Sequence, residues 1–162
     1  MPNILIKIIG NAYSHTNDDA YHHMISYICK KNYFGGYGFF PATPCETIIQ
    51  HFQSCETCSL DHIDKKMWHF IISTQDNVQE NQFAFLADQI ALLFASEYQC
   101  IYGLDFDKGH PHIHVAVNTH SYHPTHPALT QTLFEQYITQ VQSLITRLYT
   151  NTSLSIQWEG AE

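Results

Sequence analysis

Residues 100–118, which read CIYGLDFDKGHPHIHVAVN, decide the fold of this chain. Two apolar runs flank Asp107-Lys108-Gly109, whose residue types favour a tight turn, so the segment is predicted to be an antiparallel hairpin. Side chains two positions apart on a strand project from the same face of a sheet. His112 and His114 are therefore expected side by side, with Ile113 pointing into the core behind them.

The rest of the chain supplies strands and helices that can surround this hairpin. Apolar and β-branched runs predict five strands in all, at residues 4–9, 67–73, 100–106, 110–118 and 154–158. Apolar spacings of three and four predict helices at about residues 20–31, 45–54, 77–98 and 128–149. The glycine- and aromatic-rich stretch 32–44 is expected to be a loop. This order predicts an α+β fold, an antiparallel five-stranded sheet with helices packed on it, as a single domain over residues 1–162.

Composition narrows the class of protein. Hydrophobic residues make up 44% of the chain, which is enough for a packed core and too much for intrinsic disorder. No apolar stretch is long enough to span a membrane, and the first residues lack the layout of an export signal. The formal charge of −8 argues by itself against nucleic acid, because phosphate binding favours a basic surface.

The cysteines indicate a reducing compartment. There are five of them, an odd number in a chain without an export signal, which favours reduced thiols in the cytoplasm over a disulfide framework. Cys45, Cys55 and Cys58 lie near His51 and His62, and this set matches the spacing of a structural zinc site only in part. The role of these three cysteines stays open at this point.

The hairpin carries the residues best suited to chemistry. Neutral imidazoles bind divalent transition metals, and His112 and His114 present two of them on one face. Asp105 lies across the turn on the paired strand, where its carboxylate would complete a three-ligand face with positions left open for substrate. His110 is an alternative third ligand, because it is expected on the same face.

The run His-Pro-His-Ile-His-Val-Ala-Val-Asn at 110–118 resembles the histidine-hydrophobic-histidine signature of the HUH endonucleases, and specifically of relaxases from mobilisable plasmids and conjugative elements. Other segments resemble the same family. Trp68–Ser73 is similar to the strand that precedes its central helix, and 88–103 to the helix and strand that lead into the metal hairpin. His23-Met-Ile-Ser-Tyr27-Ile28 is similar to its tyrosine motif. The tyrosine precedes the histidine pair, as in relaxases, whereas it follows the pair in rolling-circle initiators and small HUH transposases.

The resemblance implies a ferredoxin-like relaxase palm that nicks single-stranded DNA at an origin of transfer, for plasmid mobilisation or conjugation. Tyr27 would be the nucleophile and form a covalent 5′-phosphotyrosine, with Tyr21 as its main rival. Manganese or magnesium would be the metal, held by Asp105, His112 and His114. Lys30, Lys31 and Tyr33 are expected to contact the DNA. Accessory relaxosome proteins would be further partners, and no association with a membrane is expected. The chain would be the catalytic core of a longer relaxase.

One position departs from the family pattern. Relaxases of this type usually carry a histidine seven residues before the first histidine of the pair, and this chain has Asp105 there. The first alternative is therefore a catalytically degenerate relaxase-like module that binds DNA without cutting it. A second alternative, from a different class, is a histidine-rich metal-binding protein unrelated to DNA.

Overall fold

The computed structural model describes residues 3–9, 19–31, 33–39, 42–106 and 110–159. In these residues the chain forms six strands and four helices. They are, in order, β1 (Asn3–Ile9), α2 (Ala20–Cys29), β2 (Tyr33–Tyr37), α3 (Cys45–Cys58), β3 (Met67–Thr74), α4 (Glu80–Ala95), β4 (Cys100–Asp105), β5 (His112–Asn118), α5 (Gln131–Leu148) and β6 (Ser153–Glu159). The α+β class is confirmed. The turn expected at residues 107–109 lies outside the described residues.

The strands form one mixed sheet in the order β2-β4-β5-β3-β1-β6. The expectation of five antiparallel strands is wrong on two counts. Residues 33–37, expected in a loop, form the edge strand β2, and β6 pairs with β1 in the parallel sense. The remaining ladders are antiparallel, and the predicted hairpin of β4 and β5 lies near the middle of the sheet.

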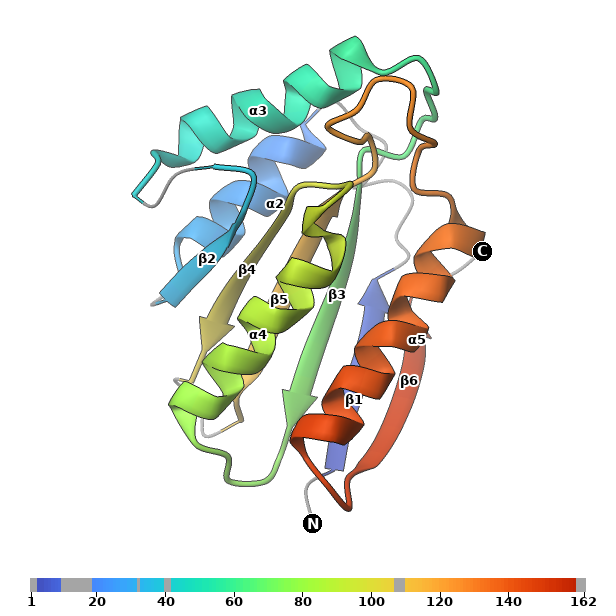
Figure 1. The fold of residues 1–162 in the computed structure, drawn as a ribbon. Helices are drawn as coiled ribbons and strands as arrows, with labels where there is room; N and C mark the ends of the chain where they lie inside the picture. Colours follow the sequence, from blue (N-terminus) through green and yellow to red (C-terminus); the bar gives the residue numbers. More distant parts are fainter. Residues whose placement is uncertain (1–2, 10–18, 32, 40–41, 107–109, 160–162) are drawn as a thin grey trace.

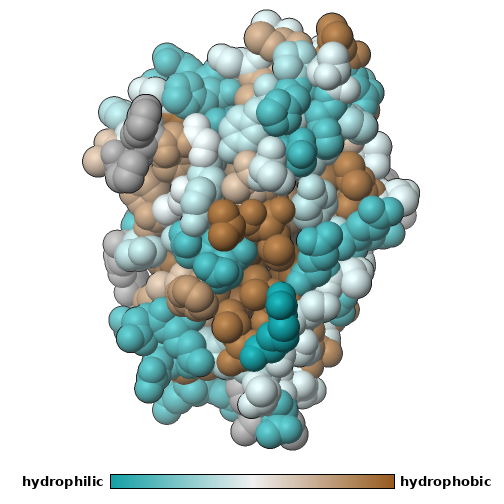
Figure 2. All heavy atoms as spheres, viewed as in Figure 1, coloured by the Kyte–Doolittle hydropathy of each residue, from teal (hydrophilic) through white to brown (hydrophobic). Residues whose placement is uncertain are grey.

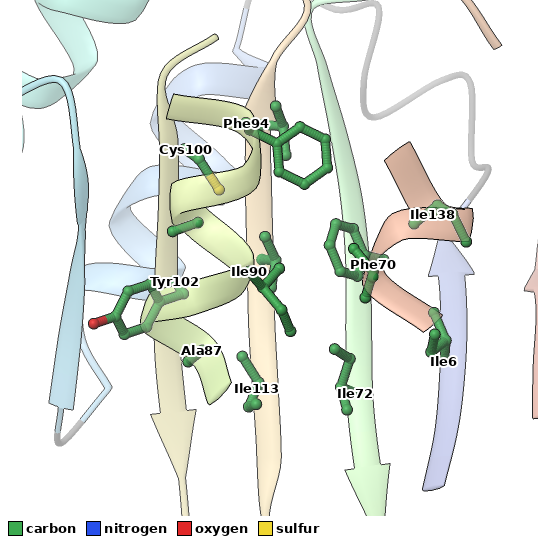
Figure 3. Packing of buried hydrophobic residues seen from close by; sticks show 14 of the residues in the cluster. Ile6, Phe70, Ile72, Ala87, Ile90, Phe94, Cys100, Tyr102, Ile113 and Ile138 are labelled. Atoms are coloured by element: carbon green, nitrogen blue, oxygen red, sulfur yellow. The ribbon is translucent and has the colours of Figure 1, made fainter. Parts of the chain in front are cut away.

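Helices pack on both faces of this sheet (Figure 1). α4 and α5 cover the face drawn in front, over a core that includes Phe70, Ile72 and Ile113 (Figure 3). Figure 2 shows the same side in space-filling form, with apolar residues gathered in its middle and hydrophilic ones around them. No helix of the described residues is long and apolar enough to cross a membrane.

The opposite face is covered only in part. α2 and α3 pack together over Met67, Ile101 and Ala116, at the β4–β5 side of the sheet. Neither α2 nor α3 packs to any extent on β1 or β6 in the described part of the chain, and Lys7 on this face of β1 is half-buried. Part of the sheet therefore lies beside α2 with no described helix above it, and this open strip borders the histidines of β5.

Asn118 ties the end of β5 to its surroundings. Its side chain is fully buried, donates through Nδ2 to the Phe52 carbonyl (3.1 Å) and to Gln99 Oε1 (3.4 Å), and accepts through Oδ1 from the His120 amide (3.2 Å). We expect Asn118→Ala to lower the free energy of unfolding by about 2–3 kcal/mol, because it removes three hydrogen bonds of a fully buried side chain. Urea unfolding would measure the change.

The matched control for this prediction is Asn81→Ala, at an exposed position of α4. It should change the stability by less than about 0.5 kcal/mol. Equal unfolding midpoints for Asn118→Ala and the wild type would contradict the assigned role of Asn118 in fixing the strand end.

Candidate active site

Three histidines lie in a row on the face of the sheet that α2 partly covers. His112 and His114 project from β5 to this face, while Ile113 between them is buried in the core on the other side, as predicted. The ring of His114 is 6.2 Å from that of His112 and 6.0 Å from that of His69 on β3, centroid to centroid. The structure thus places His69, from the predicted strand 67–73, beside His114.

Tyr27 reaches the histidines from α2. Its ring packs edge-on against that of His114, with 5.1 Å between centroids, yet 45% of the residue is exposed. Tyr21, the rival nucleophile, is buried, and its hydroxyl donates to Glu56 Oε2 at 3.3 Å. Burial, with the nearby charge of Glu56, raises the pKa of Tyr21 above its usual range. Of these two tyrosines, only Tyr27 combines exposure with a contact to the histidines.

Lys31 is the cation nearest to this tyrosine. Its Nζ lies 4.1 Å from the centroid of the Tyr27 ring and 3.5 Å from Asp105 Oδ2. Lys30, which the sequence analysis gave as an expected DNA contact, is exposed at the C-terminal cap of α2. The spacing of four residues between Tyr27 and Lys31 is the signal that distinguishes them, because such residues are neighbours on a helix. No pattern in the sequence predicts the pairing of Lys31 with Asp105.

Asp105 lies directly opposite His112 in the register of β4 and β5. Its carboxylate is therefore beside the histidine pair, as the hairpin prediction required. His110, the alternative third ligand, precedes β5 and is exposed.

Gly103 allows α2 to approach β4 closely. It pairs with His114 in the ladder, and a Cβ at this position would lie 2.7 Å from Lys31 Cγ and 3.0 Å from the Ile28 carbonyl oxygen. A side chain here would push the end of α2, with Tyr27 and Lys31, away from the histidines. The glycine is thus a requirement of the site geometry.

This gives a prediction for Gly103→Ala. We expect overpacking to lower the free energy of unfolding by about 1–2 kcal/mol. Because Tyr27 is displaced, the reaction expected at its hydroxyl should also be roughly tenfold slower. The control is Gly35→Ala, whose Cβ would lie 2.7 Å from the Tyr102 hydroxyl on the opposite face of the sheet. It should cost similar stability and leave the reaction rate within about twofold. Equal rates for the two variants would refute the argument.

His114 is held in the neutral state. Burial, together with the charges of Lys31 and His112, lowers the pKa of His114 to about 4, and Asp105 opposes the shift only in part. Its Nδ1 is buried and has no hydrogen-bond partner among the described residues. A neutral imidazole with an unused nitrogen can bind a metal ion.

The donor groups fit a divalent ion by their chemistry. Two imidazoles and one carboxylate share a face, a set that transition metals and manganese accept. Within the described part of the chain, however, no three histidine, cysteine or acidic side chains converge closely enough to hold an ion. At the hairpin, the Asp105 carboxylate forms an ion pair with Lys31 at 3.5 Å.

The aromatic residues of β2 divide between the two faces. Tyr33 pairs with Leu104 in the ladder and stacks on Tyr102, 6.4 Å between centroids, on the α4 side. The structure therefore does not bring Tyr33 together with Tyr27. Phe34, one position on, pairs with Gly103 and is 37% exposed on the histidine side.

A groove of about 470 Å³ begins at His112 and crosses the open strip of the sheet. Its lining includes Ser73, Leu5 and Ser155, which follow one another across β3, β1 and β6 in the same row as His112. Asp76 lines one end of it. The groove is thus lined by serine hydroxyls together with one leucine in this row.

The cysteines do not form a metal centre among the residues that the structure describes. All five are free thiols, with Cys55 donating to Gln99 Oε1 and Cys58 exposed at the end of α3. Burial raises the pKa of Cys55 to about 11, with a smaller contribution from Cys58. A raised thiol pKa disfavours the thiolate that zinc requires.

Comparison with known proteins gave one family. The family model described as "Relaxase: MobA/VirD2-like, nuclease domain" matches residues 27–137, about two thirds of the chain. The matched segment begins at Tyr27 and includes Lys31, Asp105, His112 and His114. Neither the curated proteins nor the solved structures yielded a significant match.

Proposed function

Because the chain belongs to the MobA/VirD2-like relaxase nuclease domain family, we propose that it nicks single-stranded DNA at an origin of transfer and holds the cut strand on Tyr27. The observation that carries this proposal is the packing of an exposed tyrosine against His114, 5.1 Å between ring centroids, with His112 next along the same strand. The activity serves plasmid mobilisation or conjugation, and residues 1–162 act as the catalytic core.

In the proposed reaction the phenol oxygen of Tyr27 attacks the scissile phosphorus. A new bond joins this oxygen to phosphorus, and the bond from phosphorus to the 3′ oxygen breaks. The phenol gives its proton to solvent, solvent protonates the departing 3′ oxygen, and a 5′-phosphotyrosine remains. One phosphodiester replaces another, so the strand can be rejoined by the reverse reaction, as DNA transfer requires.

His112, His114 and Asp105 are the residues that would hold manganese or magnesium. A bound divalent ion supplies polarisation of a phosphate oxygen and stabilises the charge that develops on it. Lys31, next to the Tyr27 ring, contributes a fixed positive charge on the same side. The contact with His114 holds the Tyr27 ring beside these groups.

The groove beside His112 is the proposed path of the single-stranded DNA away from the scissile phosphate. Phe34 offers an exposed ring on which a base can stack, and takes over the role first expected of Tyr33. Lys7 is a further cation on this face. It lies one strand beyond Ile71 in the row of His114, and it already pairs with Glu159 at 3.6 Å. Since the chain carries a charge of −8, accessory relaxosome proteins would supply further affinity for DNA.

The experiment that tests the proposal needs no knowledge of the target sequence. Protein and Mn²⁺ are incubated with single-stranded oligonucleotides that carry a randomised central segment. Species that resist SDS are isolated, the protein is digested, and the attached DNA is sequenced. We expect enrichment of one short motif, and no recovery when EDTA replaces the metal.

The recovered motif then tests the polarity of the cut. With a 3′-labelled oligonucleotide the label should move to the protein, and with a 5′-labelled one it should appear in a shorter free fragment. Binding without any covalent species would favour the degenerate DNA-binding module. Binding of metal but of no DNA would favour the unrelated metal-binding protein.

A further inference from the structure

We propose that Lys31 is shared between Asp105 and the DNA, so that a bound phosphate draws Lys31 away from Asp105 and frees this carboxylate for the metal. The inference rests on the proposed function, because it concerns the same site. It adds a coupling between two ligands, because bound DNA and bound metal each increase the affinity of the protein for the other through Lys31.

The position of Lys31 is the first support. Its ammonium group contacts the Tyr27 ring on one side and Asp105 on the other, at 4.1 Å and 3.5 Å. Its side chain is only 15% exposed, so its position is set by the protein. A phosphate placed for attack by Tyr27 therefore lies next to this cation.

The position of Asp105 is the second support. Its carboxylate lies opposite His112 in the ladder, where it is a natural partner for a metal held by the histidines. The same carboxylate now faces Lys31 at 3.5 Å. A lysine and a divalent cation compete for one carboxylate, because each is attracted by the same negative charge.

Bound DNA changes the competition between Lys31 and the metal for Asp105. A phosphodiester offers Lys31 a second anion, and when the lysine moves toward it, the negative charge of Asp105 is available to the ion at His112 and His114. Coupling of this kind is reciprocal: if DNA tightens metal binding, the metal tightens DNA binding by the same factor. Gly103 brings α2 close enough for Lys31 to reach both anions.

The test measures metal affinity in the absence of catalysis. Mn²⁺ is titrated into the intact protein by calorimetry, comparing the wild type with Lys31→Met and, as a control that also removes one positive charge, Arg147→Met. Without DNA, Lys31→Met should bind Mn²⁺ about tenfold more tightly than the wild type, within the usual range for coupled sites. Arg147→Met, altered at an exposed position of α5, should match the wild type.

The second arm adds DNA on a Tyr27→Phe background, so that no strand is cut. The probe is the single-stranded oligonucleotide recovered by covalent selection. It should tighten Mn²⁺ binding about tenfold when Lys31 is present and less than about twofold in the Lys31→Met variant. Asp105→Asn should weaken Mn²⁺ binding and abolish the coupling, and circular dichroism would verify that each variant is folded.

The outcomes separate this inference from the proposed function. If Lys31→Met and the wild type bind Mn²⁺ equally, or if none of the proteins binds it, the competition between Lys31 and the metal is refuted, whatever the nicking activity. If the Lys31→Met effect is found but the wild type never forms a covalent species, the proposed nicking fails while the competition at Asp105 stands.

Discussion

Tyr27→Phe is expected to abolish the covalent protein–DNA species, with a loss of at least about 10³-fold in its rate of formation. The substitution removes only the hydroxyl, the atom proposed to attack phosphorus. The phenyl ring can still pack on His114 and still lie beneath Lys31, so the geometry of the site is preserved. Binding of single-stranded DNA, measured by fluorescence anisotropy, should therefore change by less than about threefold.

Two other tyrosines provide matched controls. Tyr21→Phe removes a hydroxyl that donates to Glu56 in the interior, and Tyr33→Phe removes one on the opposite face of the sheet. Both variants should form the covalent species at close to the wild-type rate, and Tyr21→Phe should lose about 1 kcal/mol of stability with its hydrogen bond. If Tyr27→Phe retains the covalent species and one of these variants loses it, the nucleophile has been assigned to the wrong residue.

His114→Ala carries the second largest expected effect. His114 is the centre of the row of histidines and also the surface against which Tyr27 packs. Removing it takes away a metal ligand and the support of the nucleophile together, so we expect a loss on the order of 10³-fold in nicking, as for other groups that stabilise charge in a transition state. Affinity for Mn²⁺ should fall by at least about tenfold.

The control variants for His114 are His110→Ala and His23→Ala. His110 is exposed before β5, and His23 is exposed on α2. Both should stay within about threefold of the wild type in nicking and in Mn²⁺ affinity. A loss in His110→Ala as large as in His114→Ala would make His110 the third ligand, the alternative that the sequence allowed. Full activity in His114→Ala would contradict the proposed site.

The central hairpin was predictable from the sequence, because both of its strands are apolar and the residues between them are typical of a turn. The edge strand β2 was not. Its sequence, Tyr-Phe-Gly-Gly-Tyr, has the glycines of a loop. In the structure Gly36 has a φ of 153°, and a side chain there would collide with the backbone of Cys100 on β4. These glycines serve close strand pairing, which depends on a partner more than 60 residues away.

Local sequence patterns also could not predict the orientation of β6. Alternating apolar residues indicate a strand but do not say which neighbour it joins or in which direction. The chain passes from β5 through α5 to β6, which then pairs in parallel with β1 at the far edge. A helix between two strands permits this arrangement, whereas a tight turn would have forced antiparallel pairing.

Much of the candidate site followed from spacing alone. Two positions along a strand place His112 and His114 together, and the turn places Asp105 opposite His112. The relation of Tyr27 to His114 could not be deduced from spacing, because it depends on how α2 packs over Gly103. The same packing pairs Lys31 with Asp105, the residue that departs from the histidine usual in relaxases.

The most direct test of the account is to identify the residue that carries the DNA. The covalent species is digested with nuclease and trypsin, and the modified peptide is sequenced by mass spectrometry. Cleavage after Lys7 and Lys30 would place Tyr13, Tyr21 and Tyr27 in one peptide, 8–30, in which fragment ions on either side of Met24 separate Tyr27 from the other two. We expect a nucleotide phosphate on Tyr27. A nucleotide on any other tyrosine, or on no tyrosine at all, would contradict it.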